Sequence, residues 1–315
     1  MSRTLRIGTR GSRLALYQAE LVKSILDSHL PACRAELKVI KTSGDAGKNR
    51  EADPFETKRV FTREIEQALL NGEIDLAVHS AKDLAVTLPR GLQLGAVLAR
   101  EDARDCLLTP DGRKLRDLPQ GARVGTSALR RIVQLKRLRP DLCIEPLRGN
   151  IDTRIAKMTA GGYDAIVLAL AGLKRVDLTR HVSEIFEPEQ FFPAPGQGAI
   201  VVECRSGDSG LVEALNLLHD PESGRRLLCE RAFLRTLEGG CQLPCGIWTR
   251  EEGEELFSSG VLFGTEGQEA VGADLEGPAD DPEACGKKLA EVILESGGRR
   301  ILEKIRKSGW GKQTS

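Results

Sequence analysis

Several arginines stand where an apolar, strand-like segment gives way to a helix-like one. They are Arg10, Arg130, Arg131, Arg148 and Arg154. In open α/β sheets the carboxyl ends of the strands border the ligand crevice, and helix N-termini offer backbone N–H groups to anions. A planar guanidinium group can bind a carboxylate or a phosphate through two parallel hydrogen bonds. These arginines predict a cleft for a ligand with several negative charges, and surface ion pairing is the alternative that their spacing leaves open.

A second motif with chemical potential is His79-Ser80-Ala81-Lys82-Asp83, which directly follows the apolar segment 74–78. A carboxylate at the end of a strand can stabilise a developing cation or move a proton. Capping of the next turn or pairing with Lys82 is the alternative role for Asp83. We expect His79 to be a hydrogen-bonded structural residue.

A third motif places a thiol in a glycine-rich loop, Glu238-Gly239-Gly240-Cys241-Gln242. Two glycines permit positive φ and a close backbone approach, so Cys241 is a candidate for an exposed, reactive thiol. Buried packing is the alternative, and we expect it for Cys245. No family signature with a His or Asn partner accompanies Cys241, which disfavours a papain-like protease.

Length and composition indicate a folded protein of more than one domain. The chain has 315 residues, which corresponds to two or three domains of typical size. Hydrophobic residues make up 40% and charged residues 29%, as in ordinary globular proteins. Lys and Arg together number 46, as do Asp and Glu. Because these counts are equal, any site for a polyanion must be a local cluster of positive charge.

Targeting segments and metal sites are not expected. No run approaches the ~18 apolar residues of a membrane helix, and the N-terminus lacks a signal-peptide pattern, so we expect a cytoplasmic protein. The eight cysteines form no C-x-x-C pair and the four histidines show no metal-ligand spacing, which predicts no metal and mostly buried cysteines. Gly196-Gln197-Gly198 looks like a tight backbone passage, but it lacks the complete dinucleotide fingerprint, and no NAD is expected.

The order of elements predicts an α/β architecture over the first two hundred residues. Expected helices run from a Ser12 N-cap to about Asp27, over 61–70 and over 128–138. Expected strands cover 5–9, 36–41, 74–78, 92–98, 106–109, 142–146 and 164–170. The dipeptide Gly-Thr ends a strand before a helix twice, at Gly8-Thr9 and at Gly125-Thr126. Two similar α/β lobes would explain this repeated pattern.

From Pro221 onward the pattern changes to a smaller α+β domain. We expect a long helix to about Leu237, strands over 247–250 and 256–262, and a helix over 285–294. Residues 251–283 carry eleven acids and no Lys or Arg, which predicts a solvated face. Residues 100–180 show the opposite bias, with seventeen Lys and Arg against ten Asp and Glu.

Taken together, the ordered motifs closely resemble the porphobilinogen deaminase (hydroxymethylbilane synthase) family over almost the whole chain. The motifs are Ile7-Gly8-Thr9-Arg10-Gly11-Ser12, His79 to Leu84, Val124 to Arg131, Arg148-Gly149-Asn150 with Thr153-Arg154, Ala171 to Arg175, Gly196 to Ala199, Glu230 to Leu234 and Glu238 to Pro244. Each motif alone is modestly specific, whereas the ordered set is very specific.

The resemblance implies a transferase of tetrapyrrole biosynthesis, the route to haem- and chlorophyll-type pigments. Such an enzyme joins four porphobilinogen molecules head to tail, releasing ammonia and then linear hydroxymethylbilane. Growth starts from a dipyrromethane cofactor held by a thioether, and the attachment motif falls on Cys241. Loss of ammonia from the substrate leaves an electron-poor azafulvene and a cationic pyrrole, which a fixed carboxylate stabilises. The family's catalytic carboxylate falls on Asp83.

The resemblance also implies the residues that bind the cofactor and the substrate, since every pyrrole ring carries an acetate and a propionate. The cofactor-binding residues expected beside Cys241 are Ser80, Lys82, Asp45, Thr126, Ser127, Arg130, Arg131, Arg154 and Gln197. The substrate-binding residues expected are Arg10, Ser12, Arg148, Arg175 and Phe61, the last as a shield of the site. A monomer without nucleic-acid or membrane partners is expected.

The family fold implies two lobes like those of periplasmic binding proteins plus a small α+β C-terminal domain that carries the cofactor cysteine. We expect a discontinuous first lobe over 1–99 and 195–219, a second lobe over 100–194 and the C-terminal domain over 220–315. The chain departs from the family pattern at Ala128, where many relatives have Ser, at Lys58-Arg59-Val60, where Lys-Gly-Leu is usual, and at Cys245, where an aliphatic residue is usual. Pro195 is expected to stiffen the crossover between lobes.

Two other functions are compatible with parts of the pattern. A carboxylate receptor without turnover would keep the lobes and the arginines, but the Gly-Gly-Cys loop and the missing export signal count against it. Binding of single-stranded nucleic acid would use the basic segment 100–180. Aromatic residues are only 4% of the chain, so stacking platforms are scarce, and the net charge of zero lowers this alternative further.

Overall fold

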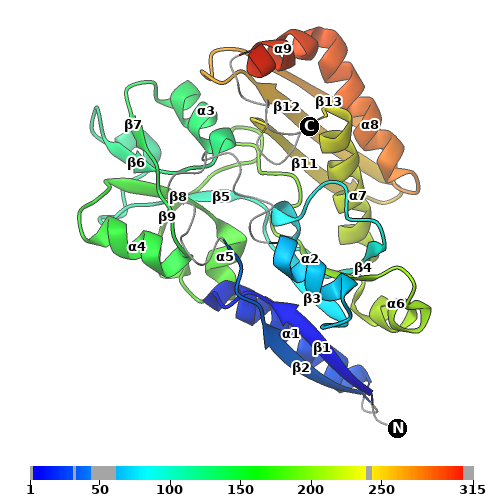
Figure 1. Ribbon diagram of the computed structural model, residues 1–315. Helices are drawn as coiled ribbons and strands as arrows, with labels where there is room; N and C mark the ends of the chain where they lie inside the picture. Colours follow the sequence, from blue (N-terminus) through cyan, green and yellow to red (C-terminus); the bar gives the residue numbers. More distant parts are fainter. Residues whose placement is uncertain (1–2, 31–32, 44–61, 239–242, 308–315) are drawn as a thin grey trace. The chain divides into compact units, whose positions relative to one another are not determined.

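The computed structural model describes residues 3–30, 33–43, 62–238 and 243–307, and it divides into two compact units (Figure 1). One unit comprises Met1–Glu101 with Gly198–Arg225, and the other comprises Asp102–Gln197 with Arg226–Ser315. The domain boundaries expected from the sequence stay a prediction. Within the described ranges no helix is both long and apolar enough to cross a membrane.

The first unit is built on a mixed sheet of five strands in the order β2-β1-β3-β10-β4. Its strands are β1 (Arg3–Thr9), β2 (Cys33–Val39), β3 (Leu76–Ser80), β4 (Leu92–Val97) and β10 (Ile200–Arg205). Its helices are α1 (Arg13–His29), α2 (Arg63–Leu70) and α6 (Ser209–Leu215). Strand β1 is parallel to β2 and β3, whereas β10 is antiparallel to β3 and β4. Strand β10 therefore enters the middle of the sheet from a distant part of the chain.

The second unit contains a sheet with the same plan, in the order β7-β6-β8-β5-β9. Its strands are β5 (Asp105–Leu108), β6 (Arg123–Gly125), β7 (Cys143–Glu145), β8 (Ala165–Ala169) and β9 (Val182–Ile185). Its helices are α3 (Leu129–Leu138), α4 (Ile151–Thr159) and α5 (Leu170–Arg175). Strand β6 is parallel to β7 and β8, and β5 is the antiparallel insert. Because β1 and β6 take equivalent positions, the two Gly-Thr turns are equivalent, and the predicted pair of similar lobes is confirmed.

The second unit also holds a three-stranded antiparallel sheet in the order β11-β12-β13 with helices beside it. The elements are α7 (Pro221–Thr236), which begins in the first unit, β11 (Cys245–Glu252), β12 (Glu255–Phe263), β13 (Ala270–Pro278), α8 (Pro282–Ile293) and α9 (Arg299–Lys307). The acids of residues 251–283 are all exposed or half-buried, as a solvated face requires. The predicted class, α/β with a C-terminal α+β part, is confirmed.

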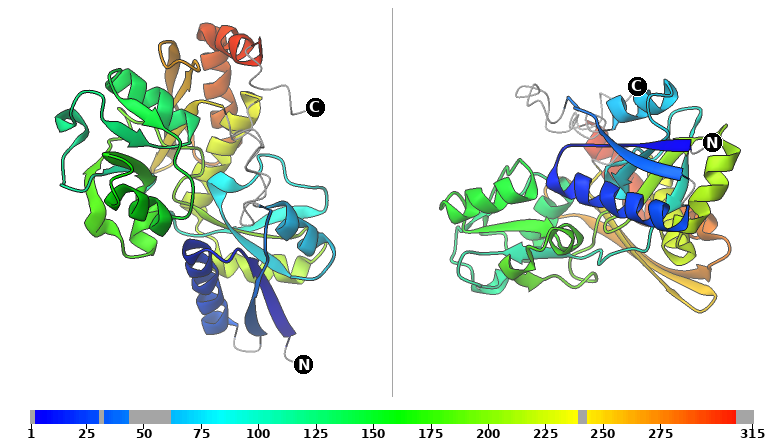
Figure 2. Two further views of the ribbon diagram at one scale, coloured as in Figure 1. Left: turned by 60° about the vertical axis from the view of Figure 1, so that its left-hand side comes forward. Right: turned by 90° about the horizontal axis from the view of Figure 1, so that it is seen from below.

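Helix α1 shows how local sequence positions the first turn of the site. Its N-cap is Ser12, whose Oγ accepts a hydrogen bond from the Ala15 backbone N–H at 3.3 Å. The apolar face of α1, including Val22 and Leu26, packs on Leu5 and other residues of the first sheet. Both views of Figure 2 show α1 lying along β1 and β2. The strand end, the turn and the helix start are thus held as one unit.

The expected elements differ from the structure mainly where pairing is distant. Helix 61–70 is seen as α2 after its N-cap Thr62, and the strand over 142–146 is shortened to β7. Strands β9 and β13 were not expected from the sequence. Strand β13 contains two glycines, a proline and two acids, a composition with low strand propensity, and it forms because β12 supplies its hydrogen bonds.

Candidate functional site

The carboxyl edge of the first sheet collects those predicted residues of the first unit that the structure describes. Strands β1 and β3 are parallel neighbours, so the turns that follow them lie at the same edge. Arg10 and Ser12 follow β1, and the 3-10 helix Ala81–Asp83 follows β3. The structure therefore brings Arg10 and Asp83 to one edge, as the sequence predicts.

The turn that carries Asp83 is held by hydrogen bonds on both sides. Gln18 Nε2 of α1 donates to Ser80 Oγ at 2.9 Å, the Ala81 N–H donates to the Ala199 carbonyl at 3.0 Å, and the Leu84 N–H closes the 3-10 turn on the Ala81 carbonyl. Asp83 itself is half-buried. Its backbone is thus fixed, while its carboxylate stays within reach of a ligand.

His79 is buried, as expected of a structural residue, but the expected hydrogen bond of its Nε2 is not found among the described residues. Its side chain is buried in the sheet, with Nε2 at 3.2 Å from Oε2 of Glu203 on the neighbouring strand β10. No part of this pair is exposed enough to meet a substrate directly.

The carboxyl edge of the second sheet collects most of the remaining predicted residues. Strands β6, β7 and β8 run parallel, so the segments after them share one edge. The residues there are Thr126 and Ser127 after β6, Arg148 after β7, and the helix that ends with Arg175 after β8. The antiparallel strand β5 begins at this edge, because Asp105 pairs with Ala169 at the end of β8.

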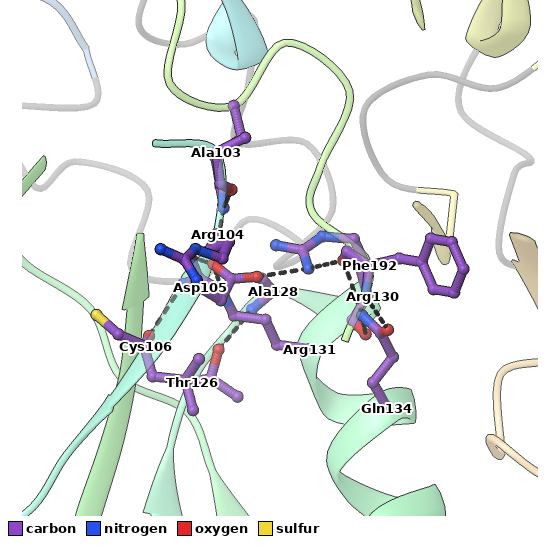
Figure 3. Close-up of polar contacts among 12 residues, drawn as sticks. Ala103, Arg104, Asp105, Cys106, Thr126, Ala128, Arg130, Arg131, Gln134 and Phe192 are labelled. Carbon is purple, nitrogen blue, oxygen red and sulfur yellow. Dashed lines mark hydrogen bonds and ion pairs between the residues drawn. The ribbon is translucent and has the colours of Figure 1, made fainter. Parts of the chain in front are cut away.

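Arg130 and Arg131 meet at the side chain of Asp105 (Figure 3). Arg130 Nη1 lies 2.6 Å from Asp105 Oδ2, and Arg131 Nη2 and Nε lie 2.6 and 3.1 Å from Oδ1. Arg131 Nη1 donates to the Val167 carbonyl, and Arg130 Nη1 also donates to the Phe192 carbonyl. Asp105 is 0% exposed, and each arginine is 6% exposed.

The charges of this cluster do not balance within the described part of the chain. Burial opposes ionisation of Asp105, but the charges and hydrogen bonds of both arginines outweigh it and hold the pKa of Asp105 well below its usual range. Burial lowers the pKa of Arg130, against the attraction of Asp105. Two guanidinium groups face one carboxylate, so a further anion at this place would be stabilised.

Thr126 and Ser127 support the turn between β6 and α3, and Gln197 supports Asp105. The Ala128 N–H donates to Thr126 Oγ1, and Ser127 Oγ exchanges hydrogen bonds with the backbone of Leu147. Gln197 is buried, and its Nε2 donates to Asp105 Oδ1 at 2.9 Å and to the Ala103 carbonyl at 2.7 Å. Gly196 and Gly198 beside it have φ of 73° and 89°, which confirms the tight passage predicted for this segment.

Arg148, Arg154 and Arg175 lie outside the buried cluster. Arg148 is exposed, and Arg154 is half-buried with its Nε donating to the Gly149 carbonyl at 2.7 Å. Arg175 is half-buried at the end of α5. Their ligand contacts remain predictions. Asp45, Phe61 and Cys241 lie outside the described residues.

Asp105 is the residue of the cluster that the sequence reasoning missed. The strand is expected over 106–109, one residue short of Asp105, and no role is predicted for this acid. A charged residue at the head of a fully apolar strand was the available signal, because a buried carboxylate requires partners.

Most cysteines of the described chain are packing residues, as predicted. Burial raises the pKa of the Cys106 thiol to about 12 and that of Cys229 to about 11. Cys245 is buried too, whereas Cys143 is exposed. Among the described residues no group of His, Cys, Asp and Glu is placed to hold a metal ion.

The two sheets, each with arginines after the carboxyl ends of its strands, define a protein with two α/β lobes and side chains suited to an anionic ligand. Some solved structures are similar to the chain at low identity. The VFT2 domain of Bordetella pertussis BvgS matches with a TM-score of 0.42 and 15% identity over 68% of this chain and 86% of that chain. The aliphatic sulphonate binding protein SsuA from Escherichia coli matches with a TM-score of 0.41 and 13% identity over 76% of this chain and 71% of that chain.

Family models and curated relatives identify the family. The model for "Porphobilinogen deaminase, dipyromethane cofactor binding domain" matches residues 5–213, and that for "Porphobilinogen deaminase, C-terminal domain" matches residues 225–295. The chain is 45% identical over 303 residues to the porphobilinogen deaminase of Syntrophobacter fumaroxidans, covering 96% of this chain and 98% of the relative. It is 46% identical over 305 residues to that of Thermus thermophilus, covering 96% and 100%. The chain belongs to the porphobilinogen deaminase family, which confirms the resemblance seen in its motifs, its class as a transferase of tetrapyrrole biosynthesis and the dipyrromethane cofactor.

Proposed function

We propose that the chain joins four porphobilinogen molecules head to tail on a dipyrromethane primer attached to Cys241, with Asp83 as the catalytic carboxylate. The observation that carries the proposal at the level of the site is the buried cluster of Arg130, Arg131 and Asp105, which has one positive charge in excess. A ligand whose pyrrole rings bear acetate and propionate groups supplies the missing anion.

Dipyrromethane fits the residues at the second sheet edge. Arg130 uses only Nη1 toward the described residues, so its Nε and Nη2 remain as donors for a carboxylate. Ser127, Arg148 and Arg154 lie along the same edge with exposed or half-buried side chains. When bound, the cofactor supplies the primer to which the substrate is joined.

The anchored turn after β3 supports the proposed role of Asp83. When ammonia leaves porphobilinogen, positive charge develops on the pyrrole, and a carboxylate near the pyrrole N–H stabilises that charge. The turn after β3 holds Asp83, and Arg10 follows the neighbouring parallel strand, which supports its proposed role in binding a substrate carboxylate.

The intact mass of the purified chain tests the primer and its site together. The wild type should exceed its sequence mass by two deaminated porphobilinogen units, and Cys241→Ser should lack this excess. Cys143→Ser, which removes an exposed thiol elsewhere, should keep it. A wild type that stays unmodified after incubation with porphobilinogen would contradict the proposal and favour the receptor alternative.

The cytoplasmic location and the monomeric state expected from the sequence belong to this proposal. Light scattering of the purified chain at working concentration should give the mass of one copy.

A further inference from the structure

Asp105 joins two arginines and a glutamine that come from distant parts of the second unit. Oδ1 accepts from Arg131 Nε and Nη2, and Oδ2 accepts from Arg130 Nη1 (Figure 3). Oδ1 also accepts from Gln197 Nε2. The two arginines come from the first turn of α3, Asp105 begins β5, and Gln197 lies at the end of a long connection. One carboxylate thus joins three side chains from distant segments of the chain.

The two arginines are used differently by this arrangement. Arg131 donates from Nε, Nη1 and Nη2 to Asp105 and to the Val167 carbonyl, so each of its nitrogens has a partner. Arg130 donates from Nη1 alone, to Asp105 and to the Phe192 carbonyl, and within the described ranges no acceptor meets its Nε or Nη2. The Phe192 carbonyl is itself held by Gln134 Nε2 at 3.1 Å. The bonds of Nη1 therefore fix the plane of the Arg130 guanidinium group and leave its other edge to a ligand.

We infer that Asp105 is a positioning residue of the reaction: it fixes the buried side chain of Arg131 and orients Arg130 toward a carboxylate of the cofactor. Asp105 makes this contribution through the arginines and does not contact the ligand. The inference rests on the proposed function for the identity of the anion, but the geometry of the cluster stands without it.

Substitution of Asp105 separates a positioning role from simple stabilisation. Asp105→Asn keeps the shape but removes the charge that holds both guanidinium groups, and Asp105→Glu keeps the charge and moves it by one methylene. The matched control is Asp141→Asn, because Asp141 also binds an arginine, Arg139, with two hydrogen bonds of 2.7 Å, at the far end of α3.

The readouts are the fraction of purified chain carrying the two-pyrrole adduct, the thermal midpoint, and kcat and KM of the loaded fraction. We expect Asp105→Asn to reduce the loaded fraction at least tenfold, Asp105→Glu to restore part of it, and Asp141→Asn to load like the wild type. A folded Asp105→Asn chain with wild-type loading and KM would overturn the inference. Where the Asn variant does not fold, Asp105→Ser takes its place, and wild-type loading and KM of that chain would do the same.

A second readout keeps the inference distinct from the proposed function. If the wild type carries no adduct, the proposed function fails, and the cluster is then tested by hydrogen exchange of the Arg131 Nε–H in the ¹⁵N NMR spectrum. Protection in the wild type and at least tenfold faster exchange in Asp105→Asn would support the positioning role. Equal exchange in both proteins would overturn it.

Discussion

Asp83 offers the sharpest test of the proposed chemistry at the scale of a residue. Asp83→Asn preserves the size of the side chain but removes the negative charge that stabilises the cationic pyrrole. We expect kcat to fall by at least about 10²-fold, with little change in the thermal midpoint, because the turn is held by backbone and Gln18 contacts rather than by the carboxylate. Steady-state assays of hydroxymethylbilane formation measure this. Asp117→Asn, on an exposed 3-10 turn, is the control, and an Asp83→Asn enzyme of wild-type kcat would exclude Asp83 as the catalytic carboxylate.

At the scale of the element, the N-cap residue of α1, Ser12, has both a structural role and a predicted functional role. Ser12 Oγ accepts from the Ala15 N–H, and Ser12 is also a predicted substrate contact at the sheet edge. Ser12→Ala should cost about 1 kcal/mol of the free energy of unfolding and also raise KM. Asp208 caps α6 in the same way, accepting from the Leu211 N–H at 3.1 Å, but lies away from the predicted site. Asp208→Ala should therefore lose a similar free energy in denaturant unfolding without a change in KM. Equal KM values for both variants would remove Ser12 from the substrate site.

The elements also show what could be predicted from the sequence. Strand ends followed by capped helices were recognisable, because Gly-Thr turns, Ser12 and the apolar periodicity are local signals. Parallel strands end at one edge, so the gathering of Arg10 with Asp83, and of Thr126 with Arg148, followed from the order of elements alone.

The contacts of Asp105 and the strand β13 could not be predicted in this way. Strand β5 joins β8 across more than fifty residues and in the antiparallel sense, so nothing near Asp105 indicates that Arg130 and Arg131 will meet it. Strand β13 is stabilised by its partner strand rather than by its own residues. Both features arise from tertiary pairing, which local propensity does not encode.

At the scale of the whole molecule, buried and half-buried carboxylates paired with arginine should set the acid limit of stability. In the first unit, burial opposes the ionisation of Asp75, but the hydrogen bonds and charge of Arg6, together with Arg205, outweigh burial. The pKa of Asp75 is therefore lower than usual. In the second unit, Arg104 lowers the pKa of Asp102 in the same way against burial. A carboxyl group whose pKa is lower in the folded than in the unfolded chain contributes stability above the unfolded value of about 4, and this contribution is lost as the pH falls through the folded value.

The thermal midpoint should therefore be nearly level from pH 7 to about pH 5 and fall steeply below about pH 4. Asp75→Asn should lower the thermal midpoint at pH 7, because it removes a charge that Arg6 and Arg205 require. It should also make the fall of the midpoint between pH 4 and pH 3 shallower, because the wild type loses the same interaction there by protonation. Glu276→Gln changes an exposed acid on β13 and should keep both the midpoint and the slope of the wild type. Calorimetric scans of the three proteins across this pH range give the thermal midpoint as a function of pH. Parallel curves for the wild type and Asp75→Asn would mean that other groups cause the acid transition. Curves that converge at low pH would assign the transition to these carboxylate–arginine pairs.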